Sequence, residues 1–158
     1  MTLRAGPRSA AHEKEFGADI LGVLTVNIRD YKIAKGFLVQ AKRAEPQDSF
    51  TRAEWKRLQG QCKRMLDVSP DAFAVAYSKS DGVRFFSASA VASFSGLNIF
   101  ELYSAGVRSF FEKHFQSFIG DSRLSQPTIQ TLQRLRSGEP DAVVPSAHVL
   151  HLTVSEAE

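Results

Sequence analysis

Two apolar segments in the first third of the chain are separated by a short polar stretch. Residues 20–28 and 37–43 have the length and apolar content of β-strands. They predict an antiparallel hairpin, in which pairing of Asp19 with Gln40 or Lys42 requires a tight turn centred between Arg29 and Tyr31. Arg29-Asp30 is not a favoured two-residue turn, and a longer loop is the alternative. The start of the first strand would then lie beside the end of the second.

One helix and two more strands are predicted next. Thr51 and Glu54 form a capping-box sequence, and the residues after them recur at helical spacing. They predict one buried stripe, made of Trp55, Leu58, Cys62, Met65 and Leu66. Residues 72–77 predict a central strand reached by a helical crossover, and residues 83–87 predict its neighbour. With a short helix expected at 9–16, the pattern predicts a mixed α/β (α+β) domain whose central mixed sheet is flanked by helices.

Beyond residue 96 the apolar pattern becomes helical. It predicts a broad, Phe-rich face that ends at Gly120. The face comprises Ile99, Leu102, Tyr103, Val107, Phe110, Phe111, Phe115 and Phe118. A further helix is predicted to start at Leu124, and residues 148–154 predict a last edge strand.

These segments are interpreted as one domain covering residues 1–158, in which residues 97–158 form a helical C-terminal extension packed on the core. Phe-rich faces are usually core, and the alternative is a surface for a homodimer or a partner protein. His114 falls on or near this face, which favours a packed or surface histidine over a metal ligand.

Composition narrows the classes of function. With 158 residues, 43% of them hydrophobic, the chain can bury a real core. No apolar run approaches the roughly 20 residues needed to cross a bilayer. We therefore expect a cytoplasmic location and no membrane partner. Cys62 is the only cysteine, which rules out an internal disulfide and a zinc site built from cysteines. The sequence also lacks a phosphate-binding Gly-x4-Gly-Lys-Ser/Thr loop, a dinucleotide Gly-x-Gly-x-x-Gly motif and a Gly-x-Ser-x-Gly elbow.

Polar residues at the facing ends of the predicted hairpin form a candidate site. Side chains alternate along a strand, so Gln40 and Lys42 lie on the same face. Asp19 opens the first strand and meets Gln40 or Lys42 if the turn is tight. The pattern therefore places a carboxylate, an amide oxygen and an ammonium on one patch of sheet, with Glu13 and Glu15 just upstream.

This arrangement resembles the PD-(D/E)xK nuclease superfamily, in particular its Mrr-like branch, where the second acidic position can be a glutamine. The resemblance is carried by Gly17-Ala18-Asp19 and by Gln40-Ala41-Lys42-Arg43. It covers about residues 12–90 and implies a restriction endonuclease-like αβββαβ core there, with extra C-terminal helices. The chain departs from the family in having no proline before Asp19, and in having Gln40 in place of the acid that gives the family its name.

The resemblance implies a metal-dependent endonuclease that hydrolyses phosphodiester bonds, with DNA favoured over RNA, in restriction, repair or as a toxin. Mg²⁺, for which Mn²⁺ can substitute, prefers oxygen ligands. Suitable ligand groups are Asp19, Gln40, the Ala41 carbonyl and Glu13, with Glu15 as the alternative upstream acid. Lys42 has the position of the family's lysine, which orients the attacking water or stabilises charge on the phosphoryl group.

The charge distribution agrees with a polyanionic partner. Residues 1–66 hold thirteen Lys or Arg against seven Asp or Glu, whereas residues 67–158 hold seven against ten. The predicted nucleic-acid contacts are Arg43, Lys56, Arg57, Lys63 and Arg64. Two alternatives stay open at this stage. The motif residues can be an ordinary cap and a solvated strand face, and the domain can be a non-catalytic nucleic-acid- or protein-binding descendant of the fold.

Overall fold

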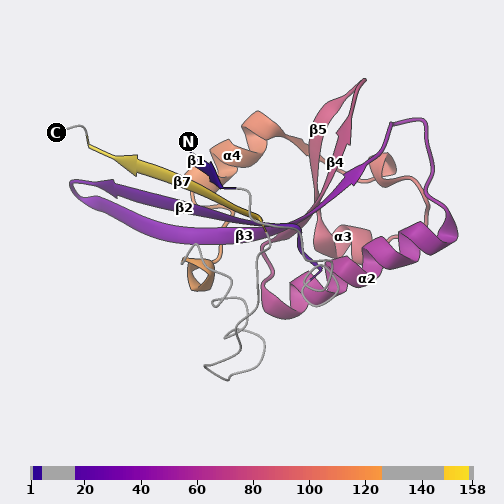
Figure 1. Ribbon diagram of the computed structural model, residues 1–158, viewed down its shortest axis with the longest axis horizontal. Helices are drawn as coiled ribbons and strands as arrows, with labels where there is room; N and C mark the ends of the chain where they lie inside the picture. The colour runs from indigo at the N-terminus through magenta and orange to yellow at the C-terminus, as the bar shows by residue number, and fades with distance from the viewer. Residues whose placement is uncertain (1, 5–16, 126–147, 157–158) are drawn as a thin grey trace.

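One mixed β-sheet organises the molecule (Figure 1). The computed structural model describes residues 2–4, 17–125 and 148–156. Among them, seven strands lie in the order β1-β7-β2-β3-β4-β5-β6. Their bounds are β1 Thr2–Arg4, β2 Ile20–Ile28, β3 Tyr31–Arg43, β4 Ala72–Ser78, β5 Gly82–Ser87, β6 Ala105–Gly106 and β7 His148–Ser155. The helices are α2 Arg52–Val68, α3 Ala88–Ser93 and α4 Val107–Phe115, with short 3₁₀ turns η1 Ile99–Glu101 and η2 Ser122–Leu124.

The predicted hairpin is confirmed, including its tight turn. Strands β2 and β3 pair antiparallel from Ile20 opposite Val39 to Ile28 opposite Tyr31. Only Arg29 and Asp30 remain for the turn, which is the tight turn needed to bring Asp19 opposite Gln40. These are not favoured turn residues, but nine consecutive cross-strand pairs hold the register.

Helix α2 connects β3 to the parallel strand β4, which confirms the predicted crossover. Its capping box is present, since the Glu54 amide donates to the Thr51 hydroxyl and the Thr51 amide donates to the Glu54 carboxylate. The predicted stripe faces the sheet, with Trp55, Leu58 and Cys62 buried. The cap fixes where α2 begins, and the apolar stripe determines which side of the helix packs on the sheet.

The sheet is covered on both faces (Figure 1). Helices α2 and α3 cover one face, where the larger apolar core lies. Helix α4 covers the other face through Phe110, whose ring lies 3.8 Å from Phe85, 4.9 Å from Phe73 and 5.0 Å from Phe37, measured between centroids. Burying one such ring stabilises the fold by about 2 kcal/mol. The predicted class, a mixed α/β domain with helices flanking a mixed sheet, is therefore correct at this level.

The C-terminal third differs from the prediction. The expected continuous helical face is divided into η1, β6 and α4, because Asn98 caps a short turn and Ala105 pairs with Phe85 at the edge of β5. Phe118 of the expected face is 78% exposed. The further helix expected after Leu124 lies outside the described residues.

Residues 148–154 were predicted to form an edge strand, and this prediction is wrong, because β7 lies between β1 and β2. It pairs parallel with β2 and antiparallel with β1, so it lies inside the sheet. Residues 97–158 thus contribute both α4 and two strands of the sheet within their described part. Among residues 2–4, 17–125 and 148–156, no helix has the length and apolar character needed to span a bilayer.

Candidate functional site

The candidate site begins where the chain enters β2 against helix α2. Gly17 has a φ of 73°, and a Cβ atom there would lie 2.2 Å from the carbonyl oxygen of Gln61. Only glycine fits this left-handed conformation and this close approach. Two residues later, the Asp19 amide donates to the Val39 carbonyl over 2.8 Å, and the Asp19 carbonyl accepts from the His148 amide over 2.9 Å. The backbone of Asp19 is therefore fixed from both sides, by β3 and by β7.

The register brings Asp19 against Gln40, as predicted. Asp19 Oδ2 accepts a hydrogen bond from Gln40 Nε2 over 2.5 Å and another from the Ala41 amide over 2.8 Å. Gln40 Nε2 also lies 3.3 Å from the Ala41 carbonyl oxygen. Three of the four groups predicted to hold a metal ion are thus gathered at one point of the sheet.

Gln40 is an unusual residue for the middle of a sheet. Its side chain is 0% exposed, and its Oε1 atom has no hydrogen-bond partner within the described part of the structure. A buried amide oxygen without a donor costs about 1–3 kcal/mol. Rotating the amide by half a turn would direct Oε1 towards the Asp19 carboxylate and the Ala41 carbonyl. In that rotated orientation three oxygens would face one another, and oxygens are the ligand type that a hard divalent ion such as Mg²⁺ prefers.

Lys42 extends the same face of β3, two residues beyond Gln40. It is half-buried on the side covered by α2, where its charge acts on Cys62. Burial raises the pKa of the Cys62 thiol to about 12, and Lys42 only partly opposes this shift. Cys62 therefore stays protonated, which excludes it as a thiolate nucleophile or ligand at neutral pH.

The remaining predicted site residues are placed less closely or not at all. Glu13 and Glu15 lie outside the described residues. Within residues 2–4, 17–125 and 148–156, no group of three or more His, Cys, Asp and Glu side chains is arranged to hold a metal ion. Among those residues, the carboxylate brought to Gln40 is that of Asp19.

The predicted basic residues lie on two faces. Lys56, Arg57 and Lys63 are exposed on α2, and Arg64 is half-buried with its Nε atom enclosed. Lys56 and Lys63 are two helical turns apart, about 10 Å, and so are Arg57 and Arg64. This row follows the helix that covers the candidate site. Arg43 is exposed at the end of β3, on the opposite face of the sheet from Lys42.

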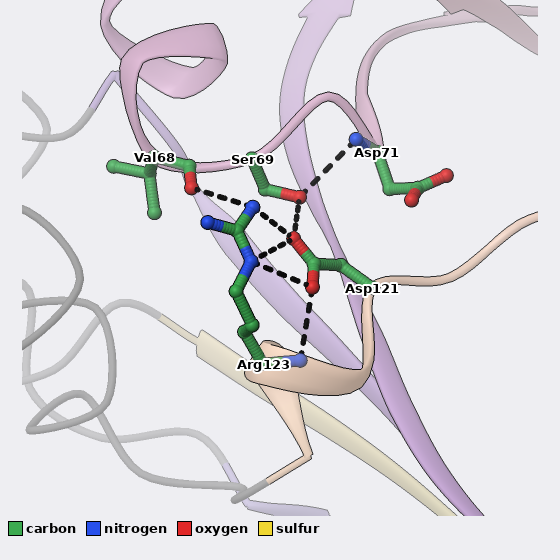
Figure 2. Close-up of polar contacts among 5 residues, drawn as sticks. All are labelled: Val68, Ser69, Asp71, Asp121 and Arg123. Carbon is green, nitrogen blue, oxygen red and sulfur yellow. Dashed lines mark hydrogen bonds and ion pairs between the residues drawn. The ribbon is translucent and has the colours of Figure 1, made fainter.

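A second polar cluster was not predicted from the sequence (Figure 2). Asp121 is buried and accepts hydrogen bonds from Ser69 Oγ over 2.7 Å and from Arg123 Nη2 over 2.6 Å. Its other oxygen accepts from the Arg123 amide, and Ser69 Oγ accepts from the Asp71 amide. Desolvation acts to raise the pKa of Asp121, but the bonds from Arg123 and Ser69 outweigh it and lower the pKa below its ordinary value. Each oxygen has donors, so the cluster ties η2 to the end of α2.

A third polar group lies beneath α4, on the face opposite Asp19 and Gln40. Lys35 is buried, and its Nζ atom donates to the carbonyl of His114. The ring of His114 is fully buried beside Phe37, and burial lowers its pKa to about 4. His114 is therefore a packed, neutral histidine.

Comparisons with known proteins gave no match to a family model, a curated protein or a solved structure. The geometry of the site and the sequence motif are therefore the grounds on which a function can be argued.

Proposed function

We propose that the protein is a metal-dependent nuclease of the PD-(D/E)xK type that hydrolyses phosphodiester bonds, with DNA as the favoured substrate. The observation that supports the proposal best is the convergence at Asp19. The buried Gln40 amide lies 2.5 Å from the Asp19 carboxylate and 3.3 Å from the Ala41 carbonyl oxygen, and Gln40 and Ala41 are on the strand that carries Lys42. A nuclease of this kind would serve in restriction, in repair or as a toxin.

Each residue of the site has a separate role in the proposed reaction. Asp19, the Ala41 carbonyl and the rotated amide of Gln40 would hold Mg²⁺ or Mn²⁺, which supplies an activated water and neutralises charge on the phosphate. Lys42 would lie beside the reacting phosphoryl group and stabilise the charge that builds there. The exposed row on α2 holds the flanking phosphates of the substrate.

Charge counting favours an additional acid in this site. Gln40 contributes no negative charge, so the described residues offer the ion one carboxylate, from Asp19. Affinity for a hard cation rises with the number of charged ligands. The proposal therefore includes Glu13, with Glu15 as its alternative, as the second carboxylate.

One observation favours a second candidate, a non-catalytic nucleic-acid- or protein-binding domain. Gln40 Nε2 already satisfies Asp19 Oδ2 and approaches the Ala41 carbonyl. This contact can hold the site together without a cation, as a structural hydrogen bond would. The basic row on α2 would then bind nucleic acid without cutting it.

The two candidates are separated by cleavage assays on plasmid DNA, single-stranded DNA and RNA in Mg²⁺ or Mn²⁺. We expect the wild-type protein to cut, and Lys42→Met to lower the rate by about 100-fold or more, because charge stabilisation in the transition state is lost. Lys32→Met is the matched control, since Lys32 is an exposed lysine near the hairpin turn of the same strand.

Cleavage by Lys42→Met at the wild-type rate would show that the site is wrongly assigned. Binding of nucleic acid without cleavage of any substrate in either metal would favour the non-catalytic domain.

A further inference from the structure

An uncovered end of the sheet adjoins the candidate site on its opposite face. Helix α4 covers this face at Phe37, Phe73 and Phe85, but the last residues of the strands reach beyond it. Figure 1 shows the β4–β5 hairpin projecting from the body of the molecule. At this end, Tyr77 is 48% exposed and its cross-strand neighbour Val83 is 39% exposed.

The residues at this end form a small platform. Arg43 pairs with Tyr77 across β3 and β4, and Tyr77 pairs with Val83 across β4 and β5. Directly paired residues share a face, so the guanidinium, the phenol ring and the apolar side chain lie side by side. Lys79, in the turn that follows β4, is also exposed. We refer to Arg43, Tyr77 and Val83 as the tyrosine platform.

Two carboxylates, Glu45 and Asp81, lie near the platform and are engaged in the β4–β5 turn. Glu45 accepts hydrogen bonds from the amide of Lys79 and from Ser80, and Asp81 is paired with Arg84 at 2.8 Å. Both acids are thus engaged in holding the β4–β5 turn. Arg84 offsets the charge of Asp81, and Glu45 offsets one of the two cations Arg43 and Lys79, so this end of the sheet keeps a small excess of positive charge.

From this arrangement we propose that the tyrosine platform binds single-stranded nucleic acid, with a base stacked on Tyr77 and its phosphate held by Arg43. An exposed aromatic ring beside a cation on a sheet is the combination that stacks unpaired bases without reading their sequence. A protein partner could bind the apolar side chains alone, and the adjacent Arg43 guanidinium would then have no role. In duplex DNA the bases are already stacked inside the helix, so the platform discriminates in favour of single strands.

This inference rests on the proposed function for the nature of the polymer, and it deepens that function by naming the substrate class. Arg43 directly follows Lys42, whose side chain lies on the other face of the same strand. A single strand held on the platform would therefore pass round the end of β3 to reach the candidate site. The platform is a binding surface and takes no part in the bond cleavage.

The test is a binding titration of labelled oligo(dT), oligo(U) and a DNA duplex, monitored by fluorescence anisotropy in EDTA so that nothing is cut. We expect Tyr77→Ala to weaken binding of the single strands by about fivefold or more and to leave duplex binding unchanged. Tyr77→Phe keeps the ring and should bind as wild type. Tyr31→Ala is the matched control, because Tyr31 is a tyrosine of similar exposure, 44%, at the distant hairpin turn.

Arg43→Met provides a second measurement. It should lower the slope of log Kd against log salt concentration for single strands by about 0.7, the value for one phosphate contact. Wild-type affinity in Tyr77→Ala, or no binding of single strands by the wild-type protein, would overturn the platform. Binding through Tyr77 without cleavage in Mg²⁺ would leave the platform standing and reject the nuclease. Cleavage by the wild-type protein in Mg²⁺, together with single-strand binding that is unchanged in Tyr77→Ala, would reject the platform and leave the nuclease standing.

Discussion

The Asp19 and Asp121 clusters are both built around an aspartate packed in the fold, yet they differ in how their polar atoms are satisfied. Asp121 has Ser69 and the Arg123 guanidinium as donors, so its charge is compensated within the fold. The partners of Asp19 Oδ2 include the neutral Gln40 amide and the Ala41 backbone amide, and the Gln40 amide leaves its own oxygen buried without a donor. A satisfied cluster of this kind stabilises a structure, whereas a buried acceptor left without a donor costs free energy, and under the proposed function a metal ion would offset that cost.

This difference predicts opposite consequences for the same substitution. Asp19→Asn should lower metal-dependent cleavage by about 100-fold or more, because the ion loses its charged ligand, while the free energy of unfolding changes by less than about 1 kcal/mol. Asp121→Asn should leave cleavage per folded molecule unchanged. Cleavage rates and urea unfolding of both variants measure the contrast. Equal loss of activity in the two variants would remove the distinction between the clusters.

Asp121→Asn should instead lower the free energy of unfolding by about 2 kcal/mol, since charge-assisted hydrogen bonds are lost. The half-exposed side chain of Arg123 keeps the value at this moderate level. The folded-state pKa of Asp121 is below its unfolded value, so this stability is fully present above about pH 4 and is lost as the pH falls through the folded-state pKa. Urea titrations at pH 7 and pH 3 should show the wild-type advantage shrinking at the lower pH. An advantage that persists undiminished at pH 3 would contradict the role of this carboxylate.

The smallest expected effect concerns Gln40, which is a metal ligand in the proposed function and stands where the PD-(D/E)xK motif has an acid. Gln40→Glu restores a second charge beside Asp19 and should tighten Mg²⁺ or Mn²⁺ binding by about tenfold, measured by calorimetry. Without the cation, two carboxylates would repel each other and the variant should unfold more easily than wild type. Gln116→Glu adds the same charge at an exposed position at the end of α4 and serves as the control. Weaker metal binding in Gln40→Glu than in wild type would count against Gln40 as a ligand.

The meeting of Asp19 with Gln40 could be predicted because it depends on local rules. A strand alternates its side chains with a period of two, and a turn of two residues fixes the register. A turn longer by one residue would have placed Asp19 opposite Val39 or Ala41 instead. The capping box of α2 and its buried stripe are local in the same sense, and both are present.

The Asp121 cluster could not be predicted, because Ser69 and Asp121 are 52 positions apart and no periodic pattern links them. The place of β7 in the sheet has a similar origin, since its parallel pairing with β2 joins Leu21 to Val149. The division of the expected Phe-rich helix has a tertiary cause, because β6 satisfies the edge of β5. Each missed feature depends on which distant segments meet, which composition and spacing do not encode.

The interior position of β7 has a consequence for synthesis on the ribosome. Residues 148–155 leave the exit tunnel long after β2 and β3 can pair, and until they arrive β2 has an open edge and Asp19 lacks its contact with His148. Nascent chains would therefore be prone to pair with one another along β2, and under the proposed function they would not yet cleave nucleic acid. Docking of β7 closes that edge and completes the backbone around Asp19 in a single late event.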